Sequence, residues 1–208
     1  MLRFWFLSFM LSSGILLAEF SPPEWRGLPG STYQTWTFST SDISPVADGF
    51  NNPHGTPQLN DIVNGTWISQ RDSRQGVWNA QSLFFSIPND DAALFTKYRI
   101  EIIWNVQATT SPNLDFYIGE NTSTAVAMDI IEDAYIPNSN WWKYTIFEAT
   151  VSTFPSTPVI YFEAKFAHLG TITPIYVDEI SIDTIAIPEP VTFVLLAAGG
   201  LLLRRRKH

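Results

Sequence analysis

The chain has 208 residues, of which 45% are hydrophobic and 14% aromatic, and its formal net charge is −8. Cysteine is absent from the sequence, which excludes disulfides, thiolate metal sites and a cysteine nucleophile. Segment 19–187 carries nineteen acidic residues against seven scattered basic ones, a net charge of −12. Because phosphate binding requires clustered Lys and Arg, we expect no nucleic-acid partner.

The N-terminal segment 1–18 predicts a secretory signal peptide. Met1 to Arg3 form a short, positively charged start, residues 4–17 are almost wholly apolar, and Ala18 supplies the small residue at the cleavage site. We expect export of the chain, and a mature protein that begins near Glu19.

The exported segment 19–187 predicts a single all-β domain. Its clearest strand covers 98–106, where Tyr98, Ile100, Ile102 and Trp104 fall on one face and charged residues on the other. The other expected strands cover 33–39, 65–70, 76–87, 114–118, 124–131, 141–151, 160–166 and 174–183. Without long helices for crossovers, these strands should pair antiparallel in two packed sheets, as a jelly-roll-like β-sandwich.

A long polar stretch interrupts this pattern between Ser39 and Asn64. It is rich in Asp, Asn, Gly, Ser and Pro and contains few large apolar residues. We expect one long loop here, and loops of this length commonly contact ligands.

Aromatic residues supply the candidate ligand-binding positions, because sandwiches that bind polysaccharides stack exposed Trp or Tyr rings on sugars. Trp141 and Trp142 are adjacent, so on a strand one of the two rings should leave the core face. The alternative is that both rings cap the end of the sandwich. Further candidates are Trp67, Trp78 and Tyr117, whereas Trp36 and Trp104 should belong to the core.

The segment Tyr176 to Asp183 contains carboxylates within an apolar strand, and burying an unpaired carboxylate is costly. It is similar to the closing strand of carbohydrate-binding modules with a galactose-binding-like jelly roll. That resemblance implies a structural calcium ion with Asp178 as an oxygen ligand and with Asp42 or Asp48 as partners. The alternative is an ordinary hydrogen-bonded or exposed carboxylate, and no other cofactor is expected.

Catalytic residues are not evident in the exported segment. Its two histidines, His54 and His168, have neither metal-binding spacing nor a nucleophile motif nearby. The acid pairs Asp90-Asp91 and Glu132-Asp133 are sequence neighbours, which rarely provide the opposed carboxylates of a glycosidase. We therefore expect a protein that is not an enzyme.

The segment 188–208 has three consecutive parts: Pro188-Glu189-Pro190, an apolar run over 191–203, and a basic cluster of Arg204, Arg205, Arg206 and Lys207. A helix over the apolar run covers about 20 Å of a hydrocarbon core about 30 Å thick, so residues 185–187 are expected to lengthen a marginal transmembrane helix. The basic cluster should remain on the cytoplasmic side.

This tail resembles the PEP-CTERM sorting signal of exopolysaccharide-producing Gram-negative bacteria. The resemblance implies that an exosortase recognises Pro188, Glu189 and Pro190, cuts an inner-membrane-anchored precursor, and delivers the domain to the cell surface or extracellular matrix. The expected partners are thus the exosortase, the membrane and exopolysaccharide. Two alternatives to a non-catalytic polysaccharide-binding domain are a polysaccharide hydrolase or lyase and a purely structural matrix component.

Overall fold

The computed structural model describes residues 21–90, 93–105, 113–119, 125–139, 141–152, 158–165 and 174–187, and these contain strands but no helix. The strands are β1 (Ser31–Trp36), β2 (Gly49–Asn51), β3 (Gln58–Val63), β4 (Thr66–Arg71), β5 (Arg74–Ala80), β6 (Ser82–Ser86), β7 (Phe95–Asn105), β8 (Asn113–Gly119), β9 (Val126–Ala127), β10 (Asp129–Tyr135), β11 (Trp142–Ser152), β12 (Val159–Lys165) and β13 (Ile175–Ile187).

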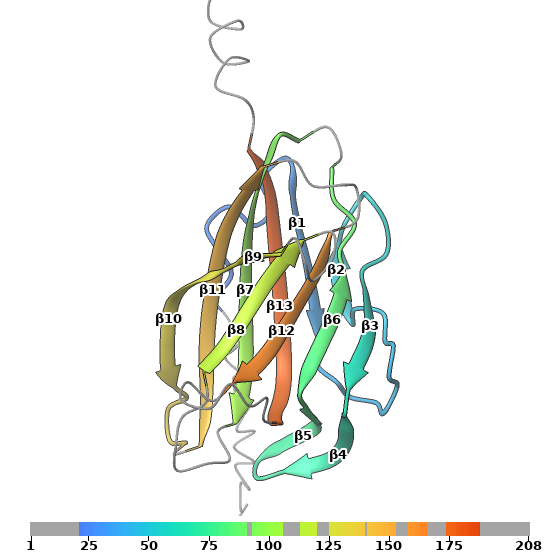
Figure 1. Cartoon of the computed structure of the whole chain (residues 1–208), viewed down its shortest axis with the longest axis vertical. Coiled ribbons are helices and arrows are strands. Elements are labelled where there is room, and N and C mark those ends of the chain that lie inside the picture. The colour runs from blue at the N-terminus through green and yellow to red at the C-terminus, as the bar shows by residue number, and fades with distance from the viewer. Residues whose placement is uncertain are drawn as a thin grey trace, which may run out of the picture.

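The strands form two antiparallel sheets that face each other (Figure 1). The eight-stranded sheet has the order β10-β11-β7-β13-β1-β2, and the β4–β5 pair joins it through β13. The five-stranded sheet has the order β3-β6-β12-β8-β9. The predicted antiparallel β-sandwich is therefore confirmed.

The core lies between the sheets because both sheets contribute buried apolar residues to one large cluster. Ile100 of β7 is paired with Ile182 of β13, and both are fully buried. Aromatic rings also meet in the core: the centroids of Trp36 and Phe85 lie 4.8 Å apart, so a residue of the larger sheet contacts one of the smaller sheet. Trp36 and Trp104 are both buried, as predicted.

Three of the predicted elements were wrong in their boundaries. The expected strand 124–131 is two short strands, β9 and β10, which separate at Met128 and enter different sheets. The expected strand 76–87 is two strands, β5 and β6, which separate at Gln81 and enter different sheets. The expected loop 39–64 contains β2, β3 and an isolated bridge between Val46 and Gln58. In β3 the only fully buried residue is Leu59, so the strand lacks the apolar alternation on which the prediction relied.

Strand β13 continues to Ile187, and Ile185 and Ile187 are paired with Lys97 and Phe95 of β7. Residues 185–187 are thus part of the sheet, which corrects the expectation that they lengthen a transmembrane helix. The predicted signal peptide 1–18 and tail 188–208 lie outside the described residues. Within the described ranges, no helix is long and apolar enough to cross a membrane.

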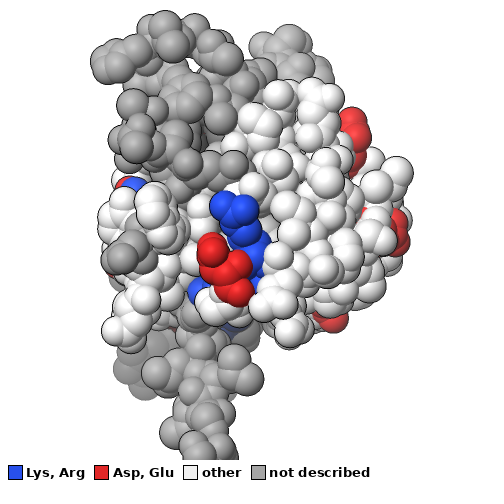
Figure 2. All heavy atoms as spheres, turned by 90° about the horizontal axis from the view of Figure 1, so that it is seen from below, with Lys and Arg blue, Asp and Glu red and all other residues white. Residues whose placement is uncertain are grey.

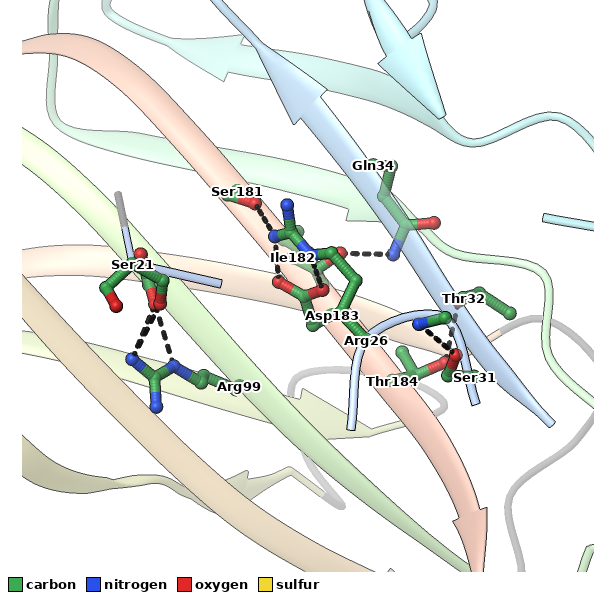
Figure 3. Close-up of polar contacts among 12 residues, drawn as sticks. Ser21, Arg26, Ser31, Thr32, Gln34, Arg99, Ser181, Ile182, Asp183 and Thr184 are labelled. Atoms are coloured by element: carbon green, nitrogen blue, oxygen red, sulfur yellow. Dashed lines mark hydrogen bonds and ion pairs between the residues drawn. The ribbon is translucent and has the colours of Figure 1, made fainter. Parts of the chain in front are cut away.

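The segment 21–30 lies across the outer face of the eight-stranded sheet and is held there by a buried ion pair (Figure 3). Nε and Nη2 of Arg26 each donate to a carboxylate oxygen of Asp183 at 2.5 Å, and Asp183 is fully buried. Arg99 donates to the carbonyl oxygen of Ser21 and pairs with buried Glu101. Burial raises the pKa of Asp183 and of Glu101, while the nearby arginines oppose this rise.

Candidate functional site

The β10–β11 hairpin separates the two adjacent tryptophans. Oγ of Ser139 accepts hydrogen bonds from the backbone N–H groups of Trp141 and Trp142, which fixes the start of β11. Trp142 is 2% exposed and packs on the outer side of the eight-stranded sheet with Val77 and Tyr176. Trp141 is 56% exposed. One ring is thus exposed, but not for the predicted reason: Trp141 precedes the first residue of β11, and the buried Trp142 lies on the outer side of the sheet rather than on its core face.

A second exposed aromatic residue, Tyr135, lies on the same hairpin and is 53% exposed. It is paired in register with Lys143, whose Nζ lies 5.3 Å from the Tyr135 ring centroid and is bonded to Asp133. Asp133 also accepts a hydrogen bond from Thr145 at 2.7 Å. We call Tyr135, Trp141, Lys143 and Asp133 the hairpin surface; Tyr135, Lys143 and Asp133 were not anticipated from the sequence.

The hairpin surface combines two chemical features. Its exposed rings offer flat apolar area of the kind that normally has a partner. The Asp133 side chain is 36% exposed and can accept hydrogen bonds from hydroxyl groups, whereas the Lys143 side chain is 12% exposed and is bonded to Asp133. A flat ring beside polar donors and acceptors matches a ligand that has an apolar face and a hydroxylated rim.

The outer face of the five-stranded sheet carries an aromatic row made of Phe84, Tyr161 and Tyr117. These residues are paired in register on β6, β12 and β8. The Tyr117 and Tyr161 rings are stacked at 4.8 Å between centroids, and Phe84 and Tyr161 at 5.6 Å. Parallel rings this close cover one another's faces, and Tyr161 is only 8% exposed. The row includes the predicted Tyr117, but it offers less open ring area than the hairpin surface.

Trp67 and Trp78 face each other across the β4–β5 pair. Trp78 is 3% exposed, and the partly buried Trp67 packs against the core and donates from Nε1 to the carbonyl oxygen of Phe38 at 3.0 Å. We therefore remove Trp78 and, for the same reason, Trp142 from the candidate ligand-binding residues, because neither presents a ring face to solvent. Trp67 is a weak candidate at most.

Asp178 stands at a β-bulge between Val177 and Glu179, and a bulge redirects the side chain of its extra residue. Its carboxylate lies 2.6 Å from Nη1 of Arg74. The positive charge of Arg74 thus compensates for the free energy needed to bury the Asp178 carboxylate. Asp42 and Asp48 accept hydrogen bonds from Ser44 and Thr37, respectively, and the described residues hold no group of three or more potential metal ligands. The predicted calcium ion consequently has no ligand cluster in the described part of the chain.

The acid pair Glu132-Asp133 is divided between the two sides of β10. Glu132 accepts a hydrogen bond from the Tyr144 hydroxyl, which raises the pKa of that tyrosine, whereas Asp133 faces Lys143. Two carboxylates on opposite faces of a strand cannot flank one glycosidic bond. For the other pair, Asp91 lies outside the described residues.

The turn between β4 and β5 carries three charged residues, Arg71, Asp72 and Arg74. It lies at the same end of the sandwich as the β10–β11 hairpin (Figure 1). Viewed from this end, Figure 2 shows basic and acidic surfaces in one small group with mostly uncharged described surface around it. Oδ2 of Asp72 accepts a hydrogen bond from Nε1 of Trp142 at 3.2 Å, so the two hairpins are joined directly. The guanidinium carbons of Arg71 and Arg74 lie over the rings of Tyr176 and Trp142.

No protein-family model and no curated protein matches the sequence. Similar solved structures include "Xyl-CBM35 in complex with glucuronic acid containing disaccharide", with 10% identity over 75% of this chain and 99% of that chain and a TM-score of 0.36. A second is the CBM22-1 xylan-binding domain of Paenibacillus barcinonensis Xyn10C, with 8% identity over 75% and 94% and a TM-score of 0.38.

A third similar structure is the enzymatically active domain of bacteriophage CBA120 tailspike protein 4, with 12% identity over 70% of this chain and 20% of that chain and a TM-score of 0.31. Similarity this distant concerns folds and does not carry the ligands of these proteins over to this chain. What defines the chain is its own geometry: an antiparallel two-sheet β-sandwich with an exposed aromatic hairpin at one end.

Proposed function

We propose that this protein is an exported, non-catalytic β-sandwich that binds extracellular polysaccharide through the hairpin surface. The observation that supports it most is the exposure of Trp141 on a hairpin whose other tryptophan is buried. The backbone N–H of Trp141 is hydrogen-bonded to Oγ of Ser139 directly before β11, which reduces the backbone entropy lost when a ligand stacks on the ring. Asp133, held by Lys143 and Thr145, supplies a polar contact that orients a sugar.

Replacing Trp141 by alanine should weaken binding to the exopolysaccharide of the producing organism about thirtyfold, because a stacked Trp at the centre of a contact contributes about 2 kcal/mol or more. Tyr135→Ala should weaken it less. Affinity electrophoresis in gels containing the polymer measures both effects.

The matched control is Phe50→Ala. Phe50 is 43% exposed and lies on β2, at the opposite edge of the same sheet from β10, so its loss should leave binding unchanged. Equal retardation of the parent and Trp141→Ala would refute stacking at this residue. Absence of any retardation of the parent would favour a purely structural matrix role.

We further propose that the chain is sorted as its terminal segments imply: signal-peptide cleavage near Ala18, membrane retention by residues 191–203, and processing by an exosortase at Pro188-Glu189-Pro190. Replacing these three residues by alanine should leave the full-length precursor in the inner membrane. Cell fractionation and immunoblotting of the producing bacterium measure this. Unchanged delivery of the variant to the exterior would contradict recognition of the motif.

A further inference from the structure

Arg71, at the end of β4, has hydrogen-bond donors that the described part of the protein does not use. Its guanidinium carbon lies 4.2 Å from the centroid of the Tyr176 ring, and this stacking on a buried tyrosine fixes the plane of the guanidinium. Nε of Arg71 is buried, and no described residue provides a hydrogen-bond acceptor for it. Leaving a buried donor without an acceptor is costly, so a ligand that brings an acceptor to this nitrogen would be favoured.

The neighbouring carboxylate of Asp72 does not fill this role. Its Oδ2 lies 3.8 Å from Nε of Arg71, which is longer than a hydrogen bond. The same oxygen accepts hydrogen bonds from Nδ2 of Asn105 at 3.3 Å and from Nε1 of Trp142 at 3.2 Å. Asp72 therefore ties the turn to β7 and β11, and it forms only a long ion pair with Arg71, without a hydrogen bond to Nε.

Arg71 differs from the other described cationic side chains in the distance to its nearest carboxylate oxygen. Each of them has a carboxylate oxygen within 2.7 Å; these are Arg26, Arg74, Lys97, Arg99 and Lys143. The Arg71 side chain is 40% exposed, so its terminal nitrogens are open to a ligand. In an acidic domain, an oriented arginine without a close carboxylate is a local site for an anion.

We infer that Arg71 binds an acidic substituent of the polysaccharide, a carboxylate or a sulfate ester, so that the ligand is an anionic glycan; this inference rests on the proposed function. The planar guanidinium presents parallel N–H donors that match two oxygens of such a group. Nε1 of Trp142 is bonded to Asp72, which joins the β4–β5 turn that carries Arg71 to the start of β11. Trp141 receives a sugar ring, and Arg71 selects for charge.

The test compares binding of two polymer pairs by the full chain in detergent micelles: polygalacturonate with its carboxyl-reduced form, and dextran sulfate with dextran. The parent should bind the acidic member of one pair at least about tenfold more tightly, and that pair identifies the group. Arg71→Met preserves the length of the side chain and its packing on Tyr176. It should abolish the preference and leave binding of the neutral polymer unchanged, whereas Trp141→Ala should weaken binding of both members.

A parent without preference, or an Arg71→Met variant that retains it, would overturn the inference and leave polysaccharide binding intact. Failure of every polymer to bind would overturn the inference, and the proposed function is then decided by affinity electrophoresis with the organism's own exopolysaccharide. If Trp141→Ala has no effect while Arg71→Met does, the hairpin stacking is wrong and the anion site stands.

A second measurement reports on Arg71 without any polymer. In ¹⁵N-labelled full chain, the Nε–H signal of Arg71, assigned by its loss in Arg71→Met, should shift on titration with galacturonate or with inorganic sulfate. The Nε–H signal of Arg26, which is already bonded to Asp183, should stay in place. A signal of Arg71 that responds to neither anion would also overturn the inference.

Discussion

Replacing Arg26 by alanine is expected to lower the free energy of unfolding by about 3–5 kcal/mol at pH 7, the usual cost of removing one partner from a buried ion pair. Asp183 is fully buried and receives two hydrogen bonds of 2.5 Å from Arg26. The substitution leaves this carboxylate without its closest counter-charge and releases segment 21–30 from the sheet. Chemical denaturation followed by tryptophan fluorescence measures the loss.

The free energy of unfolding lost in Arg26→Ala should depend on pH, and the direction of that dependence follows from the pKa of Asp183. Burial raises this pKa in the folded state, with Arg26 and Arg99 opposing the rise, so removal of Arg26 raises it further. A carboxyl group with a raised folded-state pKa binds its proton more tightly when folded, so its contribution to stability falls as pH rises from its ordinary pKa of about 3.9 through the raised value. The difference in free energy of unfolding between the parent and Arg26→Ala should therefore become smaller as pH falls from 7 toward 4.

The companion variant is Arg26→Ala with Asp183→Asn, which removes the buried charge together with its partner. It should recover part of the lost stability and show a weaker pH dependence than Arg26→Ala alone. Glu101 and Arg99, which also face Asp183, remain in both variants. If the stability lost in Arg26→Ala is the same at pH 7 and pH 4, the buried charge of Asp183 is not the cause of that loss.

Gly76→Ala is expected to destabilise the domain by about 3 kcal/mol, because the backbone there has no room for a side chain. Gly76 has φ of 72°, and a Cβ atom would lie 2.3 Å from the carbonyl oxygen of Phe38. That oxygen accepts the hydrogen bond of Trp67 Nε1, so displacing it also disturbs the β4–β5 pair. Thermal denaturation of the variant measures the loss.

Gly49→Ala serves as the control for Gly76→Ala. No atom lies within 4 Å of the position a Cβ atom would take at Gly49. Its stability should change by less than about 0.5 kcal/mol, as for most surface substitutions. If Gly76→Ala melts at the same temperature as Gly49→Ala, the close approach between Gly76 and Phe38 is wrong.

The strands that could be predicted from the sequence are those with sustained alternation. β7, expected at 98–106 and observed at Phe95–Asn105, is paired on both sides, and Tyr98, Ile100, Ile102 and Trp104 alternate along it into the core. The division between β5 and β6 could not be predicted, because Gln81 interrupts the run without a Gly or Pro. β3 was missed because few of its side chains enter the core.

Only part of the candidate site could be predicted from the sequence, because most of its contacts depend on which strands pair and in which register. Trp141 was singled out by strand alternation, but its exposure comes from its place in the turn before β11, which begins at Trp142. Tyr135 and Lys143 become neighbours only through the pairing of β10 with β11, which depends on the register of the hairpin. Arg71 and Tyr176 meet across two sequence-distant strands, and neither segment contains a signal for that contact.

The most direct test of the central claim is oxidation of tryptophan by N-bromosuccinimide, with and without saturating polysaccharide, followed by peptide mass spectrometry. Trp141, 56% exposed, should be oxidised rapidly in the free protein and protected when the polymer is bound, whereas Trp142, 2% exposed, should react slowly in both. Oxidation of Trp141 at the same rate in the presence of bound polymer would contradict polysaccharide binding at the hairpin surface.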